Sequence, residues 1–206
     1  DDIALPDLPQ ARGLAGTLFV HKIAGAMAES GSNLEACTIA AERVIKSSRS
    51  IGLSLDTCSV PGSLKEDRIP PGMAELGLGI HGEAGVEQVA SAGAIDAIGK
   101  MTEKLSADMP KTPYVALINN LGGASCLEMA ILTDSLLRSD FGQRIKLVVG
   151  PSAMMTALDM HGFSISVCEL ADGDEGFLTQ SVGVSSWPGC QLVQKPKVLP
   201  LPDGLT

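Results

Sequence analysis

This sequence of 206 residues has few aromatic side chains and no excess of basic ones. Only 3% of the residues are Phe, Trp or Tyr, so a hydrophobic core must be built from aliphatic side chains. The formal net charge of -9 offers no general basic surface, which argues against nucleic acid or anionic lipid as a partner. No apolar run approaches the roughly 20 residues of a membrane-spanning helix, and the first residues lack the pattern of a signal peptide. We therefore expect a soluble protein without a membrane or nucleic-acid partner.

Cysteine pairs with the spacing of a metal site or a redox dithiol are also absent. The five cysteines are widely spaced and lie mostly in apolar runs: Cys37, Cys58, Cys126, Cys168 and Cys190. Buried free thiols are the simplest interpretation, and no metal ligands are expected. Free thiols suit a reducing compartment, so we expect a cytoplasmic protein.

Apolar residues, glycine and proline are abundant. The sequence is 45% hydrophobic and 19% charged, with 23 glycines and 12 prolines. This composition excludes a disordered chain. The length allows one domain, or two small ones, with a core of its own. Frequent glycine and proline indicate tight connections between many elements, which suits an α/β architecture.

The spacing of apolar residues predicts helices that alternate with strands. Helices are predicted at residues 13–29, 33–48, 90–107 and 125–139, with a short helical stretch at 154–160. Strands are predicted at residues 51–60, 76–80, 114–119, 145–149 and 163–170. Capping boxes are predicted where Ser32 precedes Glu35 and where Ser125 precedes Glu128. We expect an α/β fold with a mixed or mostly parallel sheet flanked by helices on both faces.

Proline-rich composition marks both ends of the chain. Residues 1–10 are interpreted as an N-terminal extension and residues 188–206 as a linker or tail. Residues 11–187 between them form the predicted α/β subdomain. Within it, residues 63–72 are charged and contain two adjacent prolines, which predicts a solvated loop that could act as a mobile cover.

One of the three histidines lies in a setting that suits chemistry. His81 stands in the segment 77–85, which contains four glycines and follows a predicted strand. Glycines leave space for a ligand to approach the backbone, and ligands of α/β sheets bind at strand ends. A neutral imidazole can act there as a nucleophile or a base. The alternative is a tight glycine-rich turn whose histidine only bonds to the backbone.

The other candidate groups favour structural roles. His21 lies in the middle of a predicted helix, and His161 lies at a predicted helix end, where it would bond to terminal carbonyls. The turn at residues 119–123 superficially resembles a phosphate cradle but has neither of the glycine patterns of nucleotide sites. Three carboxylates are interpreted as solvated, capping or salt-bridged: Glu128, Asp134 and Asp159.

Several blocks, in order along the chain, resemble the dihydroxyacetone kinase family, specifically its substrate-binding K module. They are GLAGTLFVHKIAGA at 13–26, CSVPG at 58–62, ELGLGIHGE at 75–83, NNLGG at 119–123 and LDMHGFS at 158–164. The resemblance covers roughly residues 11–187 and corresponds to the C-terminal half of that module. The proline-rich tail then resembles the linker of single-chain, ATP-dependent members.

The resemblance implies a covalent role for His81. In the family, the histidine of the Gly-Ile-His-Gly-Glu block binds the ketone carbonyl of dihydroxyacetone as a hemiaminal. At this position the chain has His81, flanked by Gly79 and Gly82 as substrate-binding residues, and Ala84 where many members have proline. The substrate would be dihydroxyacetone, with glyceraldehyde as a second candidate.

The resemblance also implies what lies outside this chain. In the family, ATP and magnesium bind a separate L domain, so no cofactor is expected in this segment. Its expected partners are the N-terminal half of the K module and the nucleotide-binding L domain. The segment alone is expected to be inactive, whereas the full-length protein would be an ATP-dependent kinase of glycerol metabolism.

Two other functions stay open at this point. Eukaryotic-like members of the family are also FAD-AMP lyases that release cyclic FMN. Some K-like proteins bind the ketone, or a partner, as regulators or co-activators without turnover. The sequence leaves the oligomeric state open, a homo-oligomer included.

Overall fold

The centre of the molecule is a seven-stranded sheet with the strand order β3-β2-β1-β6-β4-β5-β7. The computed structural model describes residues 3–5, 12–81, 83–107 and 109–194. Its strands are β1 (Ser48–Ser54), β2 (Met73–Leu76), β3 (Glu87–Ala90), β4 (Tyr114–Asn120), β5 (Ile145–Ser152), β6 (Gly162–Glu169) and β7 (Cys190–Leu192). β4 pairs with β5 in parallel, and every other pair of neighbours is antiparallel. The predicted α/β fold with a mixed sheet is confirmed, and among the named strands of the described ranges only β4 and β5 pair in parallel.

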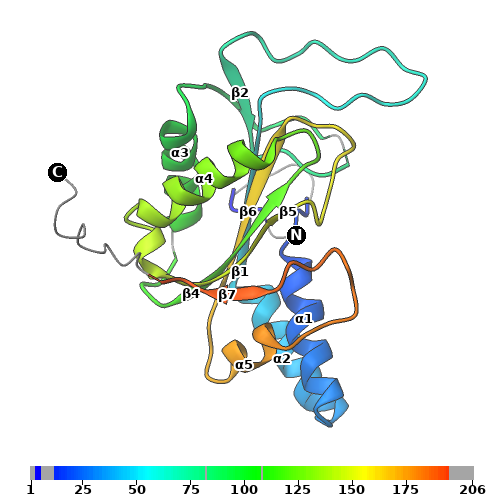
Figure 1. Cartoon of the computed structure of the whole chain (residues 1–206), viewed down its shortest axis with the longest axis vertical. Helices are drawn as coiled ribbons and strands as arrows, with labels where there is room; N and C mark the ends of the chain where they lie inside the picture. The colour runs from blue at the N-terminus through cyan, green and yellow to red at the C-terminus, as the bar shows by residue number, and fades with distance from the viewer. Residues whose placement is uncertain (1–2, 6–11, 82, 108, 195–206) are drawn as a thin grey trace, which may run out of the picture.

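Helices cover both faces of the sheet, as predicted. α3 (Ala94–Ser106) and α4 (Cys126–Arg138) lie on one face (Figure 1). α1 (Thr17–Glu29), α2 (Leu34–Ser47) and the short α5 (Asp174–Thr179) lie on the other. A short 3-10 helix, Gly142–Arg144, leads into β5. None of the helices in the described ranges is long and apolar enough to cross a membrane.

Strand β4 shows how the sequence builds two cores at once. Every residue from Tyr114 to Asn119 is buried, because the strand lies inside the sheet with helices on both sides. Successive side chains of a strand point to opposite faces. Ala116 and Ile118 therefore pack with the α3 and α4 side, whereas Val115 and Leu117 pack with the α1 and α2 side.

Side chains cap the starts of α2 and α4. α2 begins after Asn33, whose side chain accepts a hydrogen bond of 2.9 Å from the Ala36 N–H. The capping box predicted to begin at Ser32 is therefore wrong, because Asn33 satisfies the free amide instead. The box of Ser125 and Glu128 is confirmed, with both of its hydrogen bonds present at the start of α4.

Several strand boundaries differ from the prediction because pairing partners set them. β1 ends at Ser54, where its pairing with β6 stops, rather than at residue 60. The chain then leaves the sheet in a long loop, residues 55–72, that projects from the body of the molecule (Figure 1). The strand predicted at 76–80 is instead β2, which ends at Leu76. The helical stretch predicted at 154–160 is absent, since these residues form turns.

Both proline-rich ends contribute to the sheet. In the predicted N-terminal extension, Ile3 forms a bridge with Ser50. In the predicted tail, β7 pairs with the edge of β5. This edge strand has only three residues, too few for a periodic pattern to predict it.

The cysteines are free thiols in three kinds of surroundings. Cys168 is buried and Cys126 is exposed, while the other three are half-buried. Burial raises the pKa of the Cys168 thiol. The prediction of buried thiols thus holds fully only for Cys168.

Candidate functional site

His81 lies on a loop that follows β2 and is held at both ends. The guanidinium of Arg12 donates to the backbone carbonyl of Gly77 (3.1 Å) and to that of Ala84 (2.7 Å). Leu78 is completely buried in a small apolar cluster beneath the loop. These contacts close the loop and fix the position of its tip.

A buried carboxylate adds a third support. Glu75 of β2 is 2% exposed and accepts hydrogen bonds from the backbone N–H of Gly85 (3.1 Å) and from Arg68 (2.9 and 3.1 Å). Burial acts to raise the pKa of Glu75, but the hydrogen bonds from Arg68 and Gly85 outweigh it, so the pKa is lowered. The ionised carboxylate therefore joins the end of the His81 loop to the projecting loop 55–72.

Steric constraints explain why two positions near His81, 77 and 79, are glycine. The backbone N–H of His81 donates to Glu83 Oε2 (2.9 Å), and a Cβ on Gly79 would lie only 2.4 Å from that oxygen. Gly77 has a φ of +77°, which favours glycine. Gly82, the remaining predicted site residue, lies outside the described residues. The Glu83 carboxylate thus occupies the space that a side chain at position 79 would need.

The imidazole of His81 is exposed at the edge of a cleft of about 390 Å³. Ile80 lines the cleft on the same loop, Gly16 and Thr17 line it at the start of α1, and Met155 lines it from the segment after β5. No hydrogen bond joins this imidazole to another described residue. A ring nitrogen beside a small, mainly apolar cleft can add to an electrophilic carbon such as a carbonyl.

The turn at residues 119–123 is not arranged as a phosphate cradle. Asn120 Oδ1 accepts from the N–H of Gly122 (2.8 Å) and of Ala124 (3.3 Å), so these amides are already bonded. A Cβ on Gly122 would lie 1.9 Å from the carbonyl oxygen of Leu158. Close backbone packing therefore explains this glycine.

His161 is not at a helix end, so that prediction is wrong. It precedes β6, and its Nε2 lies 2.8 Å from Glu128 Oε1. Hydrogen bonds to Glu128 from the hydroxyl and the backbone N–H of Ser125, together with His161, lower the pKa of Glu128 to about 2. Glu128 is thus a capping residue, one of the roles predicted for it, and it also bonds to His161. His21 lies in the middle of a helix, as predicted, and is exposed on α1.

Sequence reasoning missed the residues that hold the loop. Arg12 lies in no recognisable pattern, and its two acceptors are 65 and 72 residues away in sequence. Glu75 and Glu83 belong to the block that carries the resemblance, but nothing in their spacing shows which backbone amides they bond.

Comparisons with known proteins point to one family. The Dak1 domain matches residues 1–185 of this chain. Dihydroxyacetone kinase of Citrobacter freundii is 43% identical over 192 residues, which cover 91% of this chain and 34% of that protein. Triokinase/FMN cyclase of Bos taurus is 36% identical over 201 residues, with 91% of this chain and 34% of that protein covered.

A subunit and a solved structure extend the comparison. The dihydroxyacetone-binding subunit DhaK of a PTS-dependent dihydroxyacetone kinase of Listeria innocua is 34% identical over 187 residues, covering 84% of this chain and 55% of that protein. The crystal structure of the C. freundii dihydroxyacetone kinase with AMP-PNP and Mg²⁺ matches with a TM-score of 0.90 at 39% identity, covering 98% of this chain and 38% of that chain. The chain thus spans about a third of the length of the first relatives it matches.

Proposed function

The chain belongs to the Dak1 domain family, and from this premise we propose that it is the substrate-binding part of a dihydroxyacetone kinase, with His81 as the residue that holds the ketone. The observation that carries the proposal is the exposed imidazole at the edge of a small cleft, on a loop fixed by Arg12, Glu75 and Glu83. The relative named as a dihydroxyacetone-binding subunit supports the substrate class.

The proposed step is addition of the His81 imidazole to the carbonyl carbon. The unprotonated ring nitrogen gives its electron pair to the carbon, so an N–C bond forms and the C=O π bond breaks. The proton on the other ring nitrogen is lost as the oxygen gains one, which leaves a neutral hemiaminal and needs no oxidant or reductant. A ketone or an aldehyde such as glyceraldehyde can react in this way, whereas glycerol, which has no carbonyl, cannot.

Phosphoryl transfer is proposed for the full-length protein. ATP and Mg²⁺ would bind a separate domain, and this chain would hold the hydroxyl of the tethered substrate in position. Positioning and charge neutralisation provide most of the catalysis in phosphoryl transfer. The chain alone is therefore expected to tether the ketone without phosphorylating it.

The test is a titration with dihydroxyacetone labelled with carbon-13 at the carbonyl. The wild-type chain should convert the ketone signal into that of a protein-bound tetrahedral carbon, and His81→Ala should not. His21→Ala is the matched control, because His21 is an exposed histidine that does not line the cleft. A tetrahedral signal that survives in His81→Ala would remove this residue from its role. Loss of the signal from both the chain and the full-length protein would overturn ketone tethering altogether.

The relatives named triokinase/FMN cyclase favour a second candidate activity for the full-length protein. Incubation with FAD and a divalent cation, followed by chromatography for cyclic FMN, tests it. If the full-length protein tethers the ketone but transfers no phosphate to it, the regulatory or co-activator function is supported in place of the kinase.

A further inference from the structure

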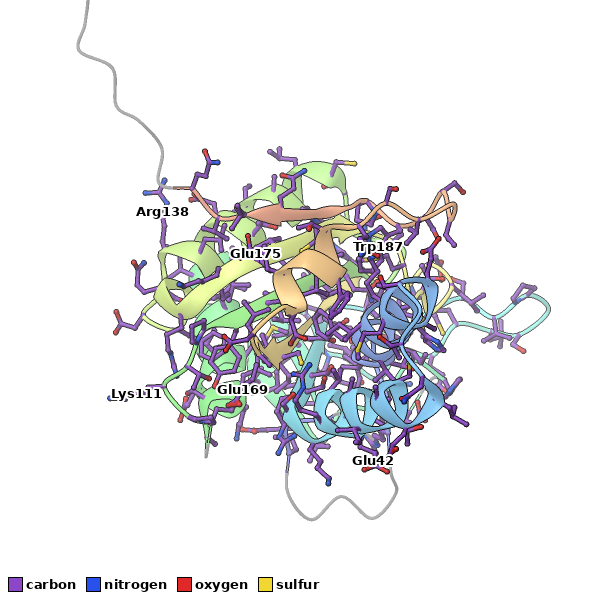
Figure 2. All side chains as sticks on the ribbon, turned by 90° about the horizontal axis from the view of Figure 1, so that it is seen from below. Glu42, Lys111, Arg138, Glu169, Glu175 and Trp187 are labelled. Atoms are coloured by element: carbon purple, nitrogen blue, oxygen red, sulfur yellow. The ribbon has the colours of Figure 1, made fainter. Side chains whose placement is uncertain are left out.

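The walls of the cleft beside His81 are mostly apolar. They are formed by the side chains of Leu14, Val20, Ile45, Ile80 and Met155. Val20 belongs to α1 and Ile45 to α2, two helices that pack side by side (Figure 2). Ile45 is 56% exposed and three of the others are half-buried, so apolar surface of the cleft is open to a ligand.

Polar side chains are few in this cleft. Besides His81, only Thr17 and Ser48 contribute one within the described ranges. The Ser48 hydroxyl is buried and donates to the backbone carbonyl of Val44 (2.7 Å). The side chain of Thr17 is exposed, and its hydroxyl has no hydrogen-bond partner among the described residues. The cleft therefore offers one free hydroxyl and, in its described lining, no lysine, arginine or carboxylate.

The cleft is also larger than dihydroxyacetone. At about 30 Å³ for each water-sized group, its volume of about 390 Å³ holds roughly 13 non-hydrogen atoms, about twice the number in dihydroxyacetone. Dihydroxyacetone has a polar hydroxymethyl group on each side of its carbonyl, so one of the two would lie against apolar walls. An alkyl group in that place would instead remove apolar surface from water, which is favourable.

We propose that this site also tethers 1-hydroxy-2-alkanones, in which an alkyl group replaces one hydroxymethyl group of dihydroxyacetone. The inference rests on the proposed function, since His81 again adds to the carbonyl carbon. The unprotonated ring nitrogen forms the N–C bond as the C=O π bond breaks, and the other ring nitrogen loses a proton while the oxygen gains one. The alkyl group lies against Val20 and Ile45, and the remaining hydroxyl of the ketone bonds to Thr17.

A series of ketones that differ only in chain length tests the proposal. Hydroxyacetone, 1-hydroxybutan-2-one and 1-hydroxypentan-2-one, each labelled with carbon-13 at the carbonyl, are titrated into the chain, and the protein-bound tetrahedral carbon is measured. Each added methylene should lower the dissociation constant about threefold, because it is buried against an apolar wall. Dissociation constants that stay constant or rise with chain length would overturn the proposal.

Val20→Thr tests the apolar wall, since it keeps the shape of the side chain and replaces a methyl group with a hydroxyl. The gain in affinity for each methylene should fall from about threefold to less than about twofold, while hydroxyacetone should bind nearly as before. Val184→Thr is the matched control, because Val184 is exposed and does not line this cleft. If Val20→Thr does not fold, Ile45→Thr repeats the test at an exposed position. An unchanged gain in the folded variant would show that this wall does not contact the alkyl group.

Failure of this proposal differs from failure of the proposed function. If dihydroxyacetone and all three alkanones form the tetrahedral carbon with equal affinity, the site tethers carbonyl compounds without using its apolar walls, and only the present inference fails. If none of them forms it, ketone tethering fails as well. His81→Ala should form no adduct with any member of the series. An adduct in that variant would show that the alkanones react elsewhere, which also overturns the inference.

Discussion

Arg68 pairs with two carboxylates that differ in burial, and burial determines how much each ion pair contributes to stability. Its guanidinium bonds both to buried Glu75 and to exposed Glu66. The two carboxylates share the same cation, so their replacement compares a buried ion pair with a solvated one in a single protein.

Glu75→Gln should lower the free energy of unfolding by about 2–3 kcal/mol, because it removes the charge that pairs with Arg68 and weakens the acceptor for Gly85. Glu66→Gln should lower it by less than about 1 kcal/mol, since water screens that pair. Urea denaturation of both variants measures the difference. Equal losses would contradict this assignment of Glu75 as the support of the loop.

Gly79→Ala should reduce ketone tethering while it changes the stability of the fold only slightly. The added Cβ meets the mobile end of the Glu83 side chain, which can move away, so the free energy of unfolding should fall by about 1 kcal/mol or less. Glu83 would then no longer accept from the His81 N–H, and less ketone should be tethered in the carbon-13 titration. Gly25→Ala is the control, since a Cβ there meets nothing. Wild-type tethering in Gly79→Ala would show that this hydrogen bond does not position His81.

Among the elements, α4 is the one whose stability depends most clearly on pH. The pKa of Glu128 at its start is lowered from 4.5 to about 2 on folding. A carboxyl group with a lowered pKa stabilises the folded state above its unfolded pKa and loses this contribution as the pH falls through the folded pKa.

Glu128→Gln should therefore be less stable than the wild type at pH 7, and the gap should close between about pH 5 and pH 2. We expect a gap of about 1 kcal/mol or less, because the carboxylate is partly exposed. Denaturation at a series of pH values tests this, with Asp134→Asn as the control for loss of an exposed charge on the same helix. A gap that stays constant down to pH 2 would exclude the cap as its source.

Elements with strong local signals could be predicted from the sequence. β4 is a run of buried apolar residues, and α4 begins with a capping box, so both were found nearly to the residue. β3 and β7 could not be found, because both are short and mostly exposed and exist through their pairing with β2 and β5. Residues 154–160 have apolar side chains but no helix, because Met160 and Ala157 fill the cluster beneath the His81 loop instead.

The same division applies to the candidate site. The glycine spacing singles out His81 and Gly79, because it is a property of one short segment. The supports of the loop could not be predicted, because Arg12 lies 65 and 72 residues from its acceptors. Only the folded chain brings α1, the projecting loop and the His81 loop together.

At the scale of the whole molecule, the segment predicted as a linker is in part structural. A chain that ends at Trp187 lacks β7, which covers the edge of β5, and it also loses the packing of Cys190 and Val193 on the two cores. It should therefore unfold at a lower temperature than a chain that ends at Gln194. Thermal denaturation of both truncations, against the full chain, measures the effect. Equal midpoints for the two truncations would show that β7 adds nothing to stability.

The pairing of β1 with β6 determines when the molecule can fold. β1 bonds along its whole length with β6, from Ser48 with Cys168 to Ser54 with Gly162. During synthesis, the centre of the sheet therefore cannot close until β6 has left the ribosome. Contacts between such distant segments make folding slow, and the edge of β1 stays open for association in the meantime. We expect the nascent chain to need chaperone protection until β6 has emerged.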